Sequence, residues 1–177
     1  PILSNIDFLM KGGKKVVITG FNGIGKSTLL KTLVGQIPAM TGIYQFSEQT
    51  AIGYFAQDLI WRDLSQTPIQ IVSDTYPDIP AKEIRKALAR CGITGEHAMQ
   101  AVGTLSGGEQ AKLKMCLLMH KPCNFLILDE PTNHLDVQAK EALKTALQEF
   151  PGTVLLVSHE AAFYKEWAGR VIDVSSH

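Results

Sequence analysis

The sequence lacks the features that mark secreted, membrane-spanning or disulfide-built proteins. No apolar run approaches the roughly 18 residues that a transmembrane helix needs, and the first twenty residues hold three lysines where a secretion signal has an apolar core. The three cysteines are odd in number and have no Cys-x-x-Cys spacing, which argues against a disulfide framework or a cysteine-built zinc site. We therefore expect a cytoplasmic protein with reduced thiols and no direct membrane insertion.

An excess of charge of one sign is missing as well. Seventeen basic and seventeen acidic residues give a formal net charge of zero, which argues against a surface built throughout to coat nucleic acid. The 177 residues, 45% of them hydrophobic and 19% charged, suit one compact domain. The sequence opens at Pro1, without a methionine and directly in a strand-like pattern, so we expect a fragment of a longer protein.

Apolar periodicity predicts an α/β fold. A β-branched run at 16–19 stops at Gly20 and is followed by leucines at helical spacing, which indicates a strand, a glycine loop and a helix. The near-continuous Leu, Ile and Val runs at 125–128 and 154–157 are typical of parallel strands covered on both faces. A helix at 137–150, a helix at 161–167 and a strand at 171–174 complete this core. Alternation at 3–10, with short strands at 42–46 and 51–55, predicts a small antiparallel edge.

Residues 57–105 have a helical character. Thr67, Pro68 and Gln70 provide a capping residue, a first-turn proline and a capping-box glutamine. A second helix is expected after Pro80, ending near Gly92, and a third is expected to follow Gly107 and Gly108 and to run to about His120. The candidate buried positions of the last two helices are Ile84, Ala87, Leu88, Cys91, Leu113, Cys116, Leu117 and Met119.

A phosphate-binding loop is predicted between the first strand and the first helix. Residues 20–27 read GFNGIGKS and match the pattern GxxxxGK[ST]. Glycines let backbone N–H groups close around phosphate oxygens, and the helix N-terminus adds its positive dipole end. Lys26 would then bridge the β- and γ-phosphates, while the Ser27 hydroxyl would bind magnesium. The alternative is a glycine-rich turn without a ligand, which the strand and helix context disfavours.

Two carboxylates end the apolar strand at 125–128, at the edge of a parallel sheet where ligands bind in α/β proteins. Asp129 would hold magnesium through water, and Glu130 is the candidate base for attack on the γ-phosphate. The alternative is an acidic pair that ends a strand and caps a turn. A lone histidine such as His159 is more often structural, but its position after the strand at 154–157 makes a catalytic role credible.

A second glycine-containing segment precedes the third of these helices. Residues 105–110 read LSGGEQ and place a hydroxyl and two glycines at a helix N-terminus, which is a second phosphate-binding device in one chain. One nucleotide needs one such device, so this segment would address a nucleotide held by another domain. The alternative is a serine cap with a flexible lead-in, and spacing alone favours that alternative.

Taken in order, GFNGIGKST, Gln57, LSGGEQ, LILDEPTNHLD and VSHE resemble the nucleotide-binding domain of ATP-binding-cassette (ABC) proteins over essentially the whole chain. The resemblance implies an α/β, RecA-like P-loop NTPase fold. Its parallel-sheet core would comprise about 1–57 and 121–177, with a short helical subdomain at about 58–120. The expected cofactors are ATP and Mg²⁺, and the expected activity is ATP hydrolysis.

The resemblance also implies roles for individual residues. Glu130, His159 and Gln57 match the catalytic glutamate, the switch histidine on the γ-phosphate, and the glutamine that touches magnesium and the attacking water. Ser27, Gln57 and Asp129 match the magnesium-associated residues, and Asp136 the loop that crosses to the opposite domain. The implied nucleotide-binding set is Gly20, Asn22, Gly23, Gly25, Lys26, Ser27, Thr28, Ser106, Gly107, Gly108, Gln110 and Asp136.

The segment 131–136, which reads PTNHLD, resembles the ABC-F group, because transport-linked cassettes usually have a serine and a small residue at Asn133 and His134. The short helical region and the ending VSHEAAFYKEW are similar to the second cassette of such a protein. This implies a partner cassette, in the same polypeptide or a homodimer, and ribosome or tRNA contacts through regions outside the chain. The adenine-stacking position would fall before Pro1. The alternative is the motor subunit of a membrane ABC transporter.

Overall fold

The computed structural model describes residue 3 and residues 6–176, and these form two compact units. The α/β unit contains residues 1–57, 122–131 and 142–177, and the helical unit contains residues 58–121 and 132–141. The sequence places 132–141 with the core, whereas in the structure this segment groups with the helical unit. The two units are described separately below.

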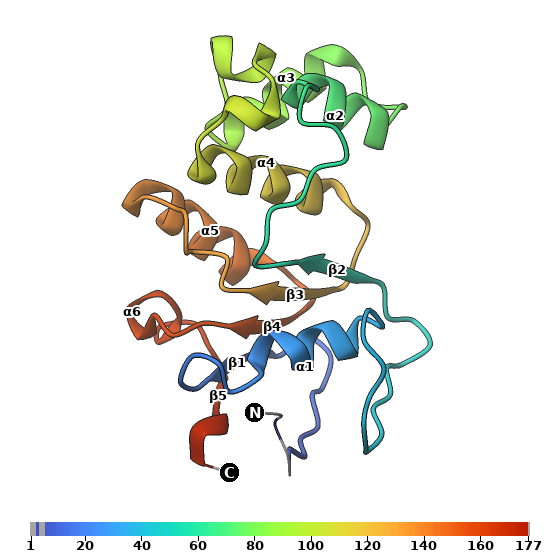
Figure 1. The fold of residues 1–177 in the computed structure, drawn as a ribbon, viewed down its shortest axis with the longest axis vertical. Coiled ribbons are helices and arrows are strands. Elements are labelled where there is room, and N and C mark those ends of the chain that lie inside the picture. The colour runs from blue at the N-terminus through green and yellow to red at the C-terminus, as the bar shows by residue number, and fades with distance from the viewer. Residues whose placement is uncertain (1–2, 4–5, 177) are drawn as a thin grey trace. The chain divides into compact units, whose positions relative to one another are not determined.

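A five-stranded parallel sheet, in the order β2-β3-β4-β1-β5, forms the α/β unit (Figure 1). Its strands are β1 (Lys15–Thr19), β2 (Ile52–Phe55), β3 (Phe125–Asp129), β4 (Thr153–Val157) and β5 (Arg170–Asp173). All five residues of β4 are buried, as expected for a strand covered on both faces. Leu30 of helix α1 (Lys26–Leu33) packs with Ile18, Ile127 and Leu155 in the core of this unit.

The predicted α/β class is confirmed, but the predicted antiparallel edge is wrong. Strand β2 pairs parallel to β3, and residues 6–10 and 42–46 form no strand; residues 4–5 lie outside the described residues. The reason is burial: Ile43 is fully exposed and Tyr44 largely so, so the alternation there covers no core face. Phe46 instead makes an edge-to-face contact with Phe125, at 5.7 Å between ring centroids.

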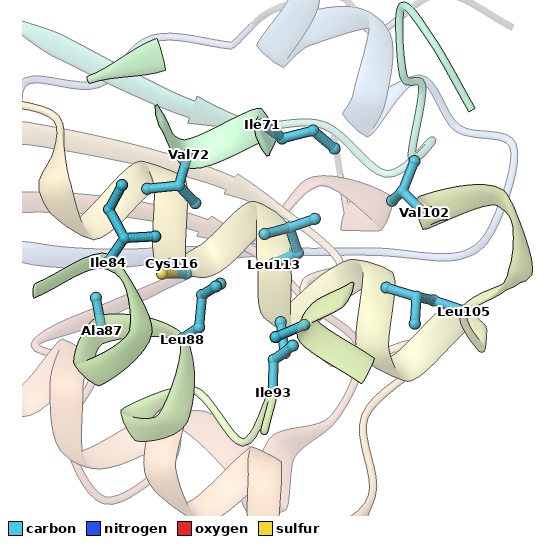
Figure 2. Packing of buried hydrophobic residues seen from close by; sticks show 11 residues of the cluster. Ile71, Val72, Ile84, Ala87, Leu88, Ile93, Val102, Leu105, Leu113 and Cys116 are labelled. Atoms are coloured by element: carbon cyan, nitrogen blue, oxygen red, sulfur yellow. The ribbon is translucent and has the colours of Figure 1, made fainter. Parts of the chain in front are cut away.

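The helical unit has its own apolar core (Figure 2). Its helices are α2 (Pro68–Thr75), α3 (Ala81–Arg90) and α4 (Gly107–His120), with the 3₁₀ turns η1 (Gly95–Met99) and η2 (Val102–Thr104). The predicted capping box at Thr67 and Gln70 is present, and it satisfies the free N–H groups of the first turn of α2. In Figure 2 side chains of α2, α3 and α4 converge, among them Val72, Leu88 and Leu113.

One predicted core position of α4 is wrong. Met119 is 59% exposed, and Leu118 is buried in its place, because the buried face of α4 follows Leu113 and Cys116 rather than the end of the apolar run. Helix α5 (Val137–Glu149) starts in the helical unit and ends in the α/β unit, where α6 (Ala161–Tyr164) and η3 (Val174–Ser176) complete the chain. Within residues 3 and 6–176, no helix has the length and hydropathy needed to cross a membrane.

The turn into β4 yields a stability prediction. A β-carbon on Gly152 would collide with the Asn124 carbonyl and with the Phe150 ring, which lies 2.6–2.8 Å away. Since the Asn124 carbonyl accepts the Thr153 N–H at 2.9 Å, the backbone there is held in place. We expect Gly152→Ala to destabilise the fold by about 1–3 kcal/mol in thermal unfolding.

The matched control is Gly12→Ala, because nothing lies within 4 Å of a β-carbon at Gly12. That variant should change the free energy of unfolding by less than about 0.5 kcal/mol. Equal unfolding midpoints for both variants would show that the close approach at Gly152 is not a constraint.

Candidate functional site

The predicted phosphate loop lies between β1 and α1. Gly25 precedes α1 with a left-handed φ of 111°, a conformation that side chains disfavour. Gly20 has no room for a side chain, because its β-carbon would lie 2.9 Å from Val174 and 3.0 Å from the Ser175 hydroxyl. The glycines are therefore needed for the path of this loop, whose backbone leads into a helix N-terminus.

Lys26 is folded over this loop and is 6% exposed. Its Nζ donates to the Gly20 carbonyl at 2.6 Å and to the Phe21 carbonyl at 2.9 Å. These bonds offset the cost of burying the ammonium group and hold it against the loop. The lysine is thus positioned where an anion seated in the loop would meet it.

Three oxygen-bearing side chains, those of Ser27, Gln57 and Asp129, lie together at the start of α1. The Ser27 hydroxyl donates to Oε1 of Gln57 at 3.3 Å, although the two residues come from different elements. Asp129, at the end of β3, is fully buried, and neither of its carboxylate oxygens has a hydrogen-bond partner. Burial raises the pKa of Asp129; the nearby Ser27 hydroxyl opposes this rise, the charge of Glu130 adds to it, and the charges of Lys31 and Lys26 oppose it.

This donor set fits a magnesium ion. Hydroxyl, amide and carboxylate oxygens are the hard ligands that Mg²⁺ prefers, and a buried carboxylate without a partner is a group that a cation would stabilise. No cluster of three or more His, Cys, Asp or Glu side chains suited to a metal occurs in the part of the chain that the structure describes. A cation would therefore be held by the mixed set of Ser27, Gln57 and Asp129.

Glu130 and His159 form a pair next to this set. Nδ1 of His159 lies 3.0–3.1 Å from the two carboxylate oxygens of Glu130. Glu130 is 7% exposed and has a left-handed φ of 46°, while its N–H donates to the Val157 carbonyl at 2.9 Å. A buried carboxylate oriented by a histidine is the arrangement that a base for water attack requires.

The sheet register explains why these residues meet. Asp129 of β3 lies opposite Val157 of β4, and Val157 lies opposite Ile18 of β1. Parallel strands end at one edge, so the residues that follow β1, β3 and β4 gather there. The predicted phosphate-loop, acidic-pair and histidine residues all belong to the α/β unit.

The segment LSGGEQ lies in the helical unit, where Ser106 caps α4. Its Oγ accepts from the Glu109 N–H at 3.2 Å, and Glu109 accepts from the Ser106 N–H at 2.9 Å. That N–H, then the Ser106 hydroxyl and His97, lower the pKa of Glu109, and the His97 ring nitrogen contacts the Glu109 carboxylate. The serine cap foreseen as the alternative is present, and it holds the turn that carries Gly107 and Gly108.

The same turn lies against the loop that carries Asp136. A β-carbon on Gly108 would be 2.6 Å from the His134 carbonyl, so glycine permits this close approach. Asp136 accepts from the Ala139 N–H at 2.8 Å, and its carboxylate is 4.0 Å from Nζ of Lys112. Among the predicted residues, Ser106, Gly107, Gly108 and Asp136 thus lie in the helical unit.

Some contacts of the predicted site residues have no sequence signal. The Gln110 amide, predicted to contact nucleotide, donates to the Leu105 carbonyl at 3.1 Å and accepts from the Trp61 indole at 2.9 Å. His97 and Trp61 lie 12 and 49 residues from their partners, outside any motif, so periodicity and spacing could not reveal them. Only the Ser-x-x-Glu capping pattern at 106–109 was visible in the sequence.

Asp129 yields a second prediction. Asp129→Asn should raise the midpoint of thermal unfolding of the nucleotide-free protein, because it removes a buried carboxylate that has no partner. Each kcal/mol gained corresponds to roughly 2–4 °C in a chain of this size. Asp78→Asn, at an exposed turn, is the control and should leave the midpoint unchanged. A lower midpoint for Asp129→Asn would contradict this account of the site.

Comparisons with known proteins show the family to which the chain is similar. Residues 3–133 match the family described as ABC transporter. The "Uncharacterized ABC transporter ATP-binding protein YfmM" of Bacillus subtilis is 45% identical over 168 residues, which cover 95% of this chain and 32% of that protein. The ABC transporter F family member 2 of Arabidopsis thaliana is 40% identical over 98% of this chain and 26% of its own length.

One mammalian relative and two solved structures are also similar to this chain. The ATP-binding cassette sub-family F member 3 of Mus musculus is 42% identical over 85% of this chain and 21% of its own length. The chain thus spans about a third or less of these relatives. A structure of the complex of the archaeal ribosomal stalk protein aP1 and the archaeal ribosome recycling factor aABCE1 matches with a TM-score of 0.76 and 25% identity, covering 92% of this chain and 32% of that one. A dimeric ATP-binding cassette bound to ADP and Pi has the same fold, with a TM-score of 0.76 and 21% identity over 97% of this chain and 85% of that one.

Proposed function

The chain belongs to the ABC transporter family as an ATP-binding cassette, and we propose that it hydrolyses ATP in a site completed by a second cassette. The observation that carries the proposal is the pairing of Glu130 with His159 beside Ser27, Gln57 and Asp129 in one unit. A phosphate loop, a cation-binding oxygen set and an oriented carboxylate are the parts that phosphoryl transfer to water requires.

In the proposed mechanism, backbone N–H groups of the glycine loop and the ammonium group of Lys26 bind the β- and γ-phosphates. Mg²⁺ held by Ser27, Gln57 and Asp129 would supply charge neutralisation at the phosphate oxygens. Glu130 orients the attacking water and accepts its proton, and His159 fixes the orientation of that carboxylate. The water oxygen then bonds to the γ-phosphorus, and the bond between the γ-phosphorus and the β-phosphate oxygen breaks. The products are ADP and inorganic phosphate.

The second cassette follows from the two phosphate-binding devices of one chain. The phosphate loop and the segment 105–110 lie in different units, and one bound nucleotide needs only one of them. A head-to-tail pair would let the serine-capped turn of each cassette address the nucleotide of the other. A cassette of the same fold that was solved as a dimer with ADP and Pi supports this arrangement.

A role in translation is the second part of the proposal. Relatives at 40–42% identity are named as F family members of the ATP-binding cassette proteins, the group that residues 131–136 resemble. A protein of similar fold is a ribosome recycling factor in complex with a ribosomal stalk protein. We propose that this cassette acts in the cytoplasm on the ribosome, with ribosome or tRNA contacts made by regions outside the chain.

Two substitutions test the assignment of the site. Lys26→Ala should weaken ATP binding in calorimetry by tenfold or more, on the order of the loss expected for a charged hydrogen-bonding partner of the phosphates. Glu130→Gln should keep the affinity for Mg²⁺-ATP and abolish most hydrolysis, since the amide accepts no proton. Lys11→Ala, at an exposed position, is the control for charge alone. Hydrolysis by Glu130→Gln at the parent rate would rule out Glu130 as the base.

The shared site makes a separate prediction about concentration. Diluting the 177-residue chain should lower its rate of ATP hydrolysis per molecule, because the pair of cassettes dissociates, while ATP affinity at the phosphate loop stays the same. The measurement is phosphate release at a series of protein concentrations, with the oligomeric state followed by light scattering. A rate per molecule that is high and constant in a monomeric sample would contradict the need for a second cassette.

A further inference from the structure

Both ends of the Gln110 side-chain amide make hydrogen bonds inside the helical unit. Its Nε2 donates to the Leu105 carbonyl at 3.1 Å, and its Oε1 accepts from Nε1 of Trp61 at 2.9 Å. Leu105 directly precedes Ser106, the cap of α4, so Gln110 fastens the entry of the chain into this helix. Because both ends of the amide are engaged, Gln110 acts on the first turn of α4 through these bonds.

Trp61 lies along the first two turns of α4. Nζ of Lys114 is 4.3 Å from the centroid of the indole ring, and Lys114 is one helical turn beyond Gln110. Burial lowers the pKa of the Lys114 ammonium group, and the face of the ring gives that cation a favourable contact. The indole therefore makes two different contacts with α4, one through its N–H and one through its ring face.

The segment that carries Trp61 is also fixed along its backbone. The Gln66 carbonyl accepts from the Val102 N–H at 2.8 Å, and the Leu64 carbonyl accepts from the Gly103 N–H at 3.0 Å. A β-carbon on Gly103 would lie only 3.0 Å from Cβ of Leu64, so the two chains are in close contact. Residues 61–66, which we call the strap, thus run beside both η2 and the start of α4.

We propose that Trp61 is a positioning residue for the serine-capped turn at 106–110, and that it acts by holding Gln110. The inference rests on the proposed function, in which that turn addresses the nucleotide of the second cassette. The capping box of Ser106 and Glu109 holds the turn from within. The strap adds a second restraint from outside the motif, through the hydrogen bond from Trp61 to Gln110.

The test uses Trp61→Phe in the full-length protein, because phenylalanine removes the N–H donor and keeps a ring for Lys114. Hydrogen–deuterium exchange of amides at 106–110, measured without nucleotide, should become about fivefold faster, as expected for the loss of one hydrogen bond. Exchange in α2 (Pro68–Thr75) should not change, since Trp61 packs against the core of the helical unit from its edge and the phenylalanine ring keeps an apolar contact there. Equal exchange at 106–110 in the parent and in Trp61→Phe would overturn the proposal.

Trp167→Phe is the matched control. The chain has two tryptophans, and the Trp167 indole also makes one hydrogen bond, to the Phe163 carbonyl at 2.7 Å, together with an edge-to-face ring contact. Trp167 lies in the α/β unit, so its loss should leave exchange at 106–110 as in the parent. Faster exchange there in Trp167→Phe would show a general loosening and overturn the assignment to Trp61.

A double-mutant cycle separates positioning from bulk packing. In a Gln110→Ala background, Trp61→Phe should add nothing to the exchange rate at 106–110, because its acceptor is already gone. An additional increase would overturn the route through Gln110. In Trp61→Phe alone, kcat for ATP hydrolysis should fall on the order of tenfold at unchanged ATP affinity, while an unchanged kcat would overturn the proposal.

Separate results would contradict the proposed ATP hydrolysis and the proposed positioning role of Trp61. If the parent protein binds no ATP, the proposed function is wrong, yet the exchange rates measured without nucleotide still decide whether Trp61 holds the turn. If the parent hydrolyses ATP and Trp61→Phe does so equally fast, the function stands and the positioning role is lost.

Discussion

The parallel register of β1, β3 and β4 is the constraint on which the site depends. Strands that run in one direction end at one edge, and Asp129, Val157 and Ile18 are neighbours across three of them. Each strand then needs only a short segment after its last residue to deliver a glycine loop, two carboxylates or a histidine to a common place. The candidate site thus combines the segments that follow β1, β3 and β4, which lie up to more than a hundred residues apart in the sequence. Formation of the sheet is enough to bring them together.

At the candidate site the α/β unit buries charged side chains, which are usually exposed to solvent. Lys26, Asp129 and Glu130 are all buried, and each is handled differently. The lysine is satisfied by two backbone carbonyls and Glu130 by a histidine, whereas the oxygens of Asp129 have no partner. Burying the Asp129 carboxylate without a hydrogen-bond partner costs free energy, and a bound cation would lower that cost.

The sequence was most informative where the candidate site is built from contiguous motifs. Residues 20–28 and 125–130 could be placed because one strand, one turn and the polar residues that follow it are read from neighbouring letters. The short strand predicted at 42–46 was wrong, because Ile43 and Tyr44 are exposed and only Phe46 of this segment makes a ring contact with the sheet. Met119 was misplaced because the apolar run continues past the buried face of α4. The contacts of Trp61 and His97 were invisible, since they join residues that only the tertiary fold brings together.

The left-handed backbone at Glu130 has a consequence for how this fold changes over time. Glycine or asparagine would fit a φ of 46° with less strain, so a drift toward thermal robustness alone would replace the carboxylate. Glutamate at this position combines a locally unfavourable conformation with the carboxylate that we propose as the base. Where ATP hydrolysis is no longer needed, substitution of Glu130 by glycine or asparagine should therefore be favoured. Such a cassette would be more stable and would not hydrolyse ATP.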